Sequence, residues 1–268
     1  MNAALAIPLL RPIVLPLIHL RAIARMMRLF LHLAWGSATI ASLFPFIGVA
    51  MRRRLKQRWS VQLLQILGVK LRHQGTAPLG LIVANHVSFL DIYAINAVSP
   101  AAFVAKDEVH NWPVIGWLSR HTETIFLERG SRSAAQRTRE HLVDKLKEDT
   151  LVALFPEGTT SDGSQVLPFH GALLQSAIDA QVPVTPIALR YLDRRGNPTQ
   201  AAAYAGDTTL VGCLWSIACS DGLIASVDVL PIMTTANGDR RHLSAHAHHQ
   251  ISKNLFPHAH SLEQKAAA

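Results

Sequence analysis

Short apolar runs that alternate with longer amphipathic stretches constrain the fold of this chain more than any other feature of its sequence. From about residue 78 onward, apolar runs of strand length recur between helical patterns. This alternation is typical of an α/β protein, because a helix crosses over between successive parallel strands. We therefore predict an α/β fold with a largely parallel central sheet flanked by helices. The predicted strands are Leu79–Ala84, Ala101–Ala105, Thr124–Leu127, Leu151–Phe155, Val184–Arg190 and Ile224–Val229, and the predicted helices are Leu90–Val98, Trp112–Arg120, Ser131–Glu148, Gly171–Ala180 and Arg240–Asn254.

The first 90 residues differ from the rest of the chain in charge. They carry eleven Lys and Arg residues and no Asp or Glu. Within them, Leu29–Ala50 is a run of 22 residues without a charged side chain, long enough to cross a bilayer core of about 30 Å. Arginines stand on both sides of the run, so the flanking charge gives no clear orientation. We therefore favour a re-entrant or interfacial pair of helices, bent at Gly36, Pro45 or Gly48, over a true membrane span.

Other interpretations of this basic segment are a buried core helix with solvated arginines, or a nucleic-acid site. The stretch RRRLKQR lacks the interleaved aromatic residues that would support binding of nucleic acid. Pro8, Pro12 and Pro16 argue against a regular helix at the extreme N-terminus. The expected organisation is a membrane-associated helical segment over 1–69, an α/β domain over 70–257 and a flexible tail over 258–268.

Several familiar catalytic and cofactor motifs are absent. The chain contains no GxGxxG, no GxxxxGK[ST], no HExxH and no GxSxG, which disfavours dinucleotide enzymes, P-loop NTPases, zincins and nucleophile-elbow hydrolases. Cys213 and Cys219 lack metal-type spacing and are interpreted as free thiols. His242, His246 and His249 share a possible helical face, but no carboxylate or cysteine set completes a metal site. We expect neither a metal nor a cofactor.

The stretch Val83–Asp91 passes from an apolar run to a polar cluster, and Asp91 is the first acidic residue of the chain. His86 and Asp91 can meet if His86 lies in the strand-to-helix loop and Asp91 in the first helical turn. One interpretation is purely structural, since Ser88 and Asp91 have the spacing of a capping box. The other is catalytic, because a carboxylate there can accept the imidazole N–H and leave the second nitrogen as a base. The two interpretations are compatible.

Three further stretches carry polar or proline residues close to predicted strands. In Phe155–Ser161, Gly158 allows a tight turn and Glu157 stands at the carboxyl end of a strand, where open α/β sheets bind ligands. Arg129 follows another strand, and its planar fork suits a phosphate, although a surface arginine is the simpler interpretation. The prolines of Val182–Ile187 suit either the wall of an acyl-chain pocket or an edge strand.

The motifs NHVSFLD, IFLERG, FPEGTTS and VPVTPIAL occur in this order, at roughly this spacing, in the glycerophospholipid acyltransferase family. The chain resembles this family, and most of all its bacterial 1-acylglycerol-3-phosphate acyltransferases, over roughly residues 70–230. The stretch FVAKDEVHNWPVIGWL also resembles the family between its first two motifs. The resemblance implies that His86 is the general base and Asp91 its orienting partner. It also implies substrate-binding roles, for the phosphate or the glycerol phosphate head group, at Lys106, Glu128, Arg129, Gly130, Glu157, Gly158 and Thr159.

The resemblance implies a membrane-bound enzyme of bacterial phospholipid biosynthesis. It would move a fatty acyl group from a thioester of coenzyme A or acyl carrier protein to 1-acyl-glycerol-3-phosphate, giving phosphatidic acid. The expected location is the cytoplasmic face of the inner membrane, with a lysolipid and the membrane surface as partners and no nucleic acid. One alternative is acylation of another lysolipid, such as lyso-ornithine lipid. Another is a non-catalytic lipid-binding membrane protein on the same fold.

Overall fold

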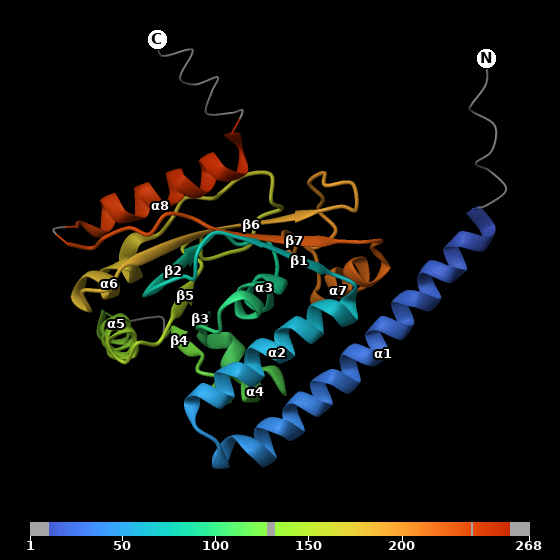
Figure 1. The fold of residues 1–268 in the computed structure, drawn as a ribbon, viewed down its shortest axis with the longest axis horizontal. Helices are drawn as coiled ribbons and strands as arrows, with labels where there is room; N and C mark the ends of the chain where they lie inside the picture. The colour runs from blue at the N-terminus through green and yellow to red at the C-terminus, as the bar shows by residue number, and fades with distance from the viewer. Residues whose placement is uncertain (1–10, 128–131, 237, 258–268) are drawn as a thin grey trace, which may run out of the picture.

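A seven-stranded sheet forms the centre of the molecule, and helices cover both of its faces (Figure 1). The computed structural model describes residues 11–127, 132–236 and 238–257. The strand order is β1-β7-β6-β2-β5-β3-β4, and every neighbouring pair is parallel except β6 with β7. The prediction of a largely parallel central sheet is therefore confirmed. The strands are β1 Lys70–Gln74, β2 Leu81–Ala84, β3 Ala102–Lys106, β4 Ile125–Leu127, β5 Val152–Leu154, β6 Val184–Leu192 and β7 Ile224–Val229.

Helices α2, α3 and α7 pack on one face of the sheet, and α5, α6 and α8 pack on the other. Successive residues of β2 point to opposite faces. Ile82 and Ala84 belong to a core cluster that includes residues of α2, α3 and α7, whereas Leu81 and Val83 pack with residues of α5, α6 and α8. Both faces are buried, which explains why the strands are continuous apolar runs. The helices are α1 Arg11–Leu43, α2 Val49–Leu67, α3 Leu90–Val98, α4 Ile115–His121, α5 Arg132–Lys147, α6 Gln175–Asp179, α7 Leu210–Cys219 and α8 Arg240–Leu255.

The predicted elements after residue 79 agree with the structure to within a few residues, but β1 and α7 were not predicted. Strand β1 has the sequence KLRHQ and is mostly exposed at the edge of the sheet, so it lacks the apolar pattern of a strand. Helix α7 is a ten-residue apolar segment, and an apolar run of that length does not reveal its period. Both elements become recognisable only from what they pack against.

The N-terminal segment is a helical hairpin, as predicted. Helix α1 ends at Leu43, a short 3₁₀ helix Phe44–Phe46 follows, and α2 begins after Gly48, so Pro45 and Gly48 lie in the turn. Gly36 does not bend α1. A Cβ atom there would lie 2.5 Å from Nε1 of Trp59, so glycine lets α1 and α2 approach closely.

Membrane association of the hairpin stays a prediction, but its apolar helix α1 is not a buried core helix. Pro16–Phe46 is long and apolar enough to cross a membrane, and only 22% of its most apolar window is buried in the protein. The expectation from the prolines was wrong for residue 11 onward, because α1 already begins at Arg11 and contains Pro16, while residues 1–10 with Pro8 lie outside the described residues. A proline near the start of a helix removes a single backbone hydrogen bond, which the following turns of a 33-residue helix outweigh.

Several basic side chains of the hairpin bind the α/β domain instead of facing outward. Arg21 and Arg25 donate to the carbonyl groups at the carboxyl end of α7, where cations stabilise the helix. Arg53 and Lys56 of α2 form ion pairs with Glu123, at 2.8 and 3.3 Å. The basic character of the first 90 residues therefore serves partly to fix the hairpin to the sheet domain.

Candidate active site

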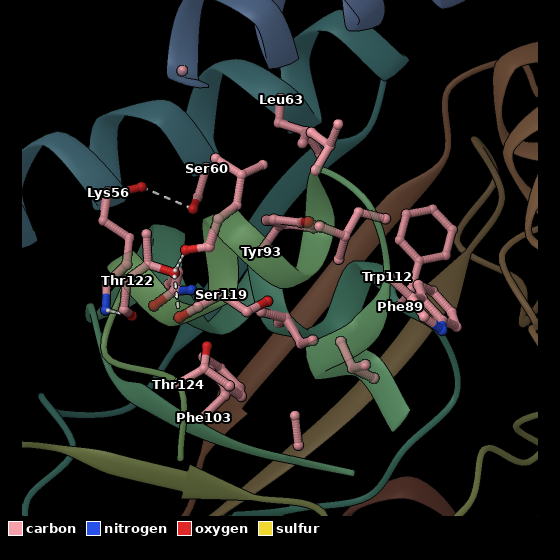
Figure 2. Close-up of a pocket in the computed structure, with 18 of the residues that line it drawn as sticks. Lys56, Ser60, Leu63, Phe89, Tyr93, Phe103, Trp112, Ser119, Thr122 and Thr124 are labelled. Carbon is pink, nitrogen blue, oxygen red and sulfur yellow. Dashed lines mark hydrogen bonds between the residues drawn. The ribbon is translucent and has the colours of Figure 1, made fainter. Parts of the chain in front are cut away.

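A cavity of about 1910 Å³ lies at the carboxyl ends of the parallel strands, between the sheet domain and the helical hairpin. His86 and Phe155, which follow β2 and β5, and Lys106, the last residue of β3, contribute to its wall. This is the edge at which open α/β sheets bind ligands. Figure 2 shows part of the lining, with Lys56 and Ser60 from α2 and Tyr93 from α3. The remaining wall comes largely from apolar residues of α1, α4 and the start of α7.

His86 and Asp91 meet on the wall of this cavity. His86 lies in the loop after β2, and Asp91 lies in the first turn of α3. Nδ1 of His86 is 2.9 Å from Oδ2 of Asp91. A carboxylate only accepts hydrogen bonds, so Nδ1 carries the proton and Nε2 of the neutral ring holds a free lone pair. No residue in the described part of the chain bonds Nε2.

The carboxylate of Asp91 is fully buried and accepts hydrogen bonds on both oxygens. Oδ2 accepts the N–H groups of Val87 and Ser88, at 2.7 and 2.9 Å, in addition to the imidazole. The Ser88 N–H bond is the half of the capping box that the sequence predicts, but the Ser88 hydroxyl binds the N–H of Leu90 instead of Asp91. Asp91 thus caps the start of α3 and holds the imidazole of His86 at the same time, and its catalytic role stays a prediction.

Tyr191, at the end of β6, completes the Asp91 site and was not found from the sequence. Its hydroxyl donates to Oδ1 of Asp91 at 2.7 Å. Burial, together with the nearby Asp91 charge, raises the pKa of Tyr191 well above its ordinary value, so the phenol keeps its proton. The two residues are 100 positions apart, and no local pattern connects them.

The imidazole of His86 is held on its flat side by Phe155, the first residue of the FPEGTTS motif. The two rings are stacked with centroids 3.9 Å apart and an angle of 7°. With Nδ1 tied to Asp91 and one ring face covered, the orientation of His86 is fixed before any substrate binds. Preorganisation of this kind lowers the cost of reaching the transition state.

Glu157 is buried and turned away from the cavity lining. Its Oε1 accepts the backbone N–H of His86 at 2.8 Å, and its Oε2 accepts the N–H of Leu167 at 3.1 Å. Burial raises the pKa of Glu157 to about 7, although these two hydrogen bonds favour the charged form. Glu157 therefore positions the His86 loop. Its predicted binding of the head group stays a prediction.

Backbone hydrogen bonds join the His86 loop to two other loops. The N–H of Ser161 donates to the carbonyl of His86 at 2.8 Å, and the N–H of Tyr204 donates to the carbonyl of Val87 at 2.9 Å. The hydroxyl of Thr160 donates to the carbonyl of Tyr204. Asn85 exchanges two side-chain hydrogen bonds with the backbone of β6. The loop that carries His86 is thus fixed on both sides.

The other predicted site residues differ in where they lie. Lys106, Gly158 and Thr159 line the cavity together with His86. Gly158 has a φ of 68°, a backbone conformation that favours glycine, so the turn after β5 requires it. Glu128, Arg129 and Gly130 lie outside the described residues, and their predicted phosphate-binding role stays a prediction.

Both interpretations of the prolines in Val182–Ile187 were wrong. Strand β6 lies between β7 and β2, so it is not an edge strand. None of the described residues 182–187 lines the cavity. Pro186 is tolerated because β7 pairs with β6 only from Ile187 onward, so Pro186 needs no N–H on that side.

Comparison with known proteins identifies the family of the chain. Residues 69–190 match the family model described as Acyltransferase. The lyso-ornithine lipid O-acyltransferase of Pseudomonas aeruginosa is 34% identical over 220 residues, which cover 81% of this chain and 84% of that protein. This chain belongs to the acyltransferase family. Within the family, the 1-acyl-sn-glycerol-3-phosphate acyltransferase of Neisseria gonorrhoeae is 41% identical over 162 residues, which cover 60% of this chain.

The similarity to the Neisseria protein spans 63% of that protein's length. A solved structure shares the fold over a longer stretch. The 1-acyl-sn-glycerophosphate (LPA) acyltransferase of Thermotoga maritima superposes with a TM-score of 0.60, over 86% of this chain and 96% of that one, at 18% sequence identity. The α/β architecture with its N-terminal helices is thus a fold already known in this acyltransferase family.

Proposed function

We propose that the protein transfers a fatty acyl group from an acyl thioester to the free hydroxyl of a lysolipid, with His86 as the general base. The pairing of His86 with Asp91 on the cavity wall is the observation that supports this most directly. It leaves Nε2 as the proton acceptor, in a cavity large and apolar enough for acyl chains. Membership of the acyltransferase family supports the same reaction.

In the proposed reaction, the acceptor hydroxyl oxygen attacks the thioester carbonyl carbon while Nε2 of His86 takes the hydroxyl proton. Asp91 stabilises the imidazolium that forms. The tetrahedral intermediate then collapses, the carbon–sulfur bond breaks, and the imidazolium returns its proton to the departing thiolate. The products are an ester and a free thiol of coenzyme A or acyl carrier protein. A positioned histidine contributes about 10²–10⁴-fold to such a step.

The leading acceptor is 1-acyl-glycerol-3-phosphate, which gives phosphatidic acid. In this proposal, Lys106, Gly158 and Thr159 meet the head group, together with Arg129 and its neighbours. The 41% identity to the Neisseria protein supports this acceptor. Lyso-ornithine lipid is the second candidate, because the Pseudomonas protein named for it matches across 84% of its length, more than the 63% of the Neisseria protein. A panel that offers each acceptor with a labelled acyl thioester decides between them by which one is consumed.

The proposed site works at the membrane, on the cytoplasmic face of the inner membrane. A lysolipid and its product both stay in a bilayer, so the enzyme has to meet them there. Helix α1 presents Phe30 and Trp35, which are 72% and 69% exposed, and large exposed apolar patches mark interaction surfaces. Arg28, Arg54 and Arg58 are also exposed, and each basic group near an anionic membrane contributes about 1 kcal/mol.

Replacing His86 tests the proposed chemistry. We expect His86→Ala to lower kcat by about 10²–10⁴-fold without unfolding the protein, because only the proton acceptor is removed. His73→Ala, an exposed histidine on β1, is the matched control and should keep wild-type activity. A non-catalytic lipid-binding protein would instead show no transfer at all in the wild type. Wild-type rates in purified His86→Ala would refute the role of His86.

A further inference from the structure

The segment between β3 and α4, residues 107–114, is firmly anchored although it is a surface connection. The carbonyl of His110 accepts a hydrogen bond from Nη1 of Arg120 at 2.7 Å. The imidazole ring of His110 packs edge-on against Phe126, with ring centroids 5.1 Å apart. A Cβ atom at Gly116 would lie 2.3 Å from the same carbonyl, so only glycine allows this packing. The side chains that project from the segment are therefore held in place.

Val114 projects from this segment through a strained turn. Its φ of 56° and ψ of −61°, with the N–H of Ile115 donating to the carbonyl of Pro113 at 2.5 Å, form a γ-turn of the rare kind with positive φ. A β-branched residue with positive φ is a genuine outlier, and such strain persists only where the surrounding structure imposes it. The side chain of Val114 is apolar and 56% exposed, so the strained turn places an apolar group at the surface.

Val114 and Trp112 lie at the mouth of the catalytic cavity. Both line the cavity and are exposed, Trp112 at 43%. Phe30, Trp35 and Leu43 of α1 share these two properties, and α1 contacts α4. We name these five residues the apolar rim. Figure 2 draws Trp112 on the same side of the view as Phe89, away from Lys56 and Thr122.

We propose that the apolar rim is a lipid-contacting surface, in which Trp112 and Val114 enter the bilayer beside the apolar residues of α1. This inference rests on the proposed function. A rim built from two elements would let the lysolipid pass from the bilayer to His86 with its acyl chain shielded from water. Burying apolar side chains in lipid is favourable in proportion to the apolar area that leaves water. The negative charges of Asp107 and Glu108 offset the positive charge of Lys106 beside them. The proposed contact therefore depends on apolar burial and not on electrostatic attraction to anionic lipid.

A polarity-sensitive fluorophore at residue 114 tests the contact without any catalysis. The label is placed at Val114→Cys, or at Leu79→Cys as the control, in a Cys219→Ser background; the native Cys213 is buried. Leu79 is 54% exposed and does not line the cavity. On adding vesicles of phosphatidylcholine and phosphatidylglycerol, we expect a blue shift of the emission at 114 and none at 79. No shift at 114, or equal shifts at both positions, would overturn the proposal.

A second experiment measures what the rim does for transfer. The double variant Trp112→Ser/Val114→Asn removes the apolar side chains, and asparagine tolerates positive φ, so the turn is kept. We expect about a tenfold slower transfer to a long-chain lysolipid held in vesicles, and less than a twofold change with a short-chain lysolipid dissolved as monomers. Leu79→Asn should change neither rate. An equal loss on both acceptors would overturn the proposal.

The two experiments separate this proposal from the proposed function. A wild-type protein that transfers to neither acceptor would refute the acyltransferase activity, and the fluorescence at 114 would still decide the lipid contact. A wild-type protein that transfers acyl groups while residue 114 stays in water would refute the rim alone.

Discussion

Glu157 should make the stability of the protein fall as the pH rises through about 7. Its carboxyl group is 4% exposed, and burial raises its pKa from an ordinary 4.5 to about 7. The folded protein therefore holds this proton more tightly than the unfolded chain does. Proton linkage then gives a contribution to stability that is fully present below the unfolded pKa, and that is lost as the pH rises through the folded pKa.

The size of the effect follows from the two pKa values. At pH 5.5 the folded carboxyl group is almost fully protonated and the unfolded one is mostly ionised, while at pH 8.5 both are ionised. Integrating the linkage between these values gives a loss of about 2 kcal/mol for Glu157 alone. Such a loss is a large share of the 5–15 kcal/mol that is typical of folded proteins.

The assay is guanidinium unfolding in mild detergent at pH 5.5 and 8.5, followed by tryptophan fluorescence. Groups that do not interact with Glu157 contribute equally in wild type and in Glu157→Gln, so their contributions cancel in the comparison. Because glutamine cannot ionise, the wild type should lose about 2 kcal/mol more than the variant between the two pH values.

The glutamine variant should also be less stable than the wild type at pH 5.5. Its amide NH₂ necessarily faces one of the two backbone N–H groups that Glu157 accepts, from His86 or Leu167. Glu108→Gln changes an exposed glutamate and serves as the matched control, with no difference from wild type. Equal losses of stability in Glu157→Gln and wild type between the two pH values would refute the reasoning.

Two further substitutions test long-range contacts. Tyr191→Phe removes a hydrogen bond to the buried carboxylate of Asp91, so the free energy of unfolding should fall by about 1.5–3 kcal/mol. The variant's kcat should fall while its KM stays unchanged. Chemical unfolding tests the first expectation, and steady-state kinetics test the second. In Glu123, burial opposes the charge but the Arg53 and Lys56 partners keep the pKa below its ordinary value. Glu123→Gln should lower the free energy of unfolding by about 2 kcal/mol, since the ion pairs of Glu123 are only partly buried. Adding Lys56→Met to that variant should recover part of the loss. A double-mutant cycle at residues 56 and 123 that shows no coupling would contradict this prediction.

Local patterns carried much of the information about this protein. The strand and helix periods predicted the α/β fold, because burial on both faces forces apolar runs that remain visible in the sequence. His86 and Asp91 were found because five residues of loop and first helical turn suffice to bring them together. Pro45 and Gly48 marked the turn of the hairpin for the same local reason. The capping box was only half right, because the hydroxyl of Ser88 binds Leu90.

The tertiary structure decided which distant groups complete the site. The strand order places β2 between β5 and β6, and neither of these strands neighbours β2 in the sequence. For that reason Glu157, after β5, reaches the backbone of His86, and Tyr191, at the end of β6, reaches Asp91. The sequence by itself determined the pairing of His86 with Asp91, since the two residues are near neighbours along the chain. Their supporting contacts depend on which strands lie side by side, and that is settled only when the whole sheet forms.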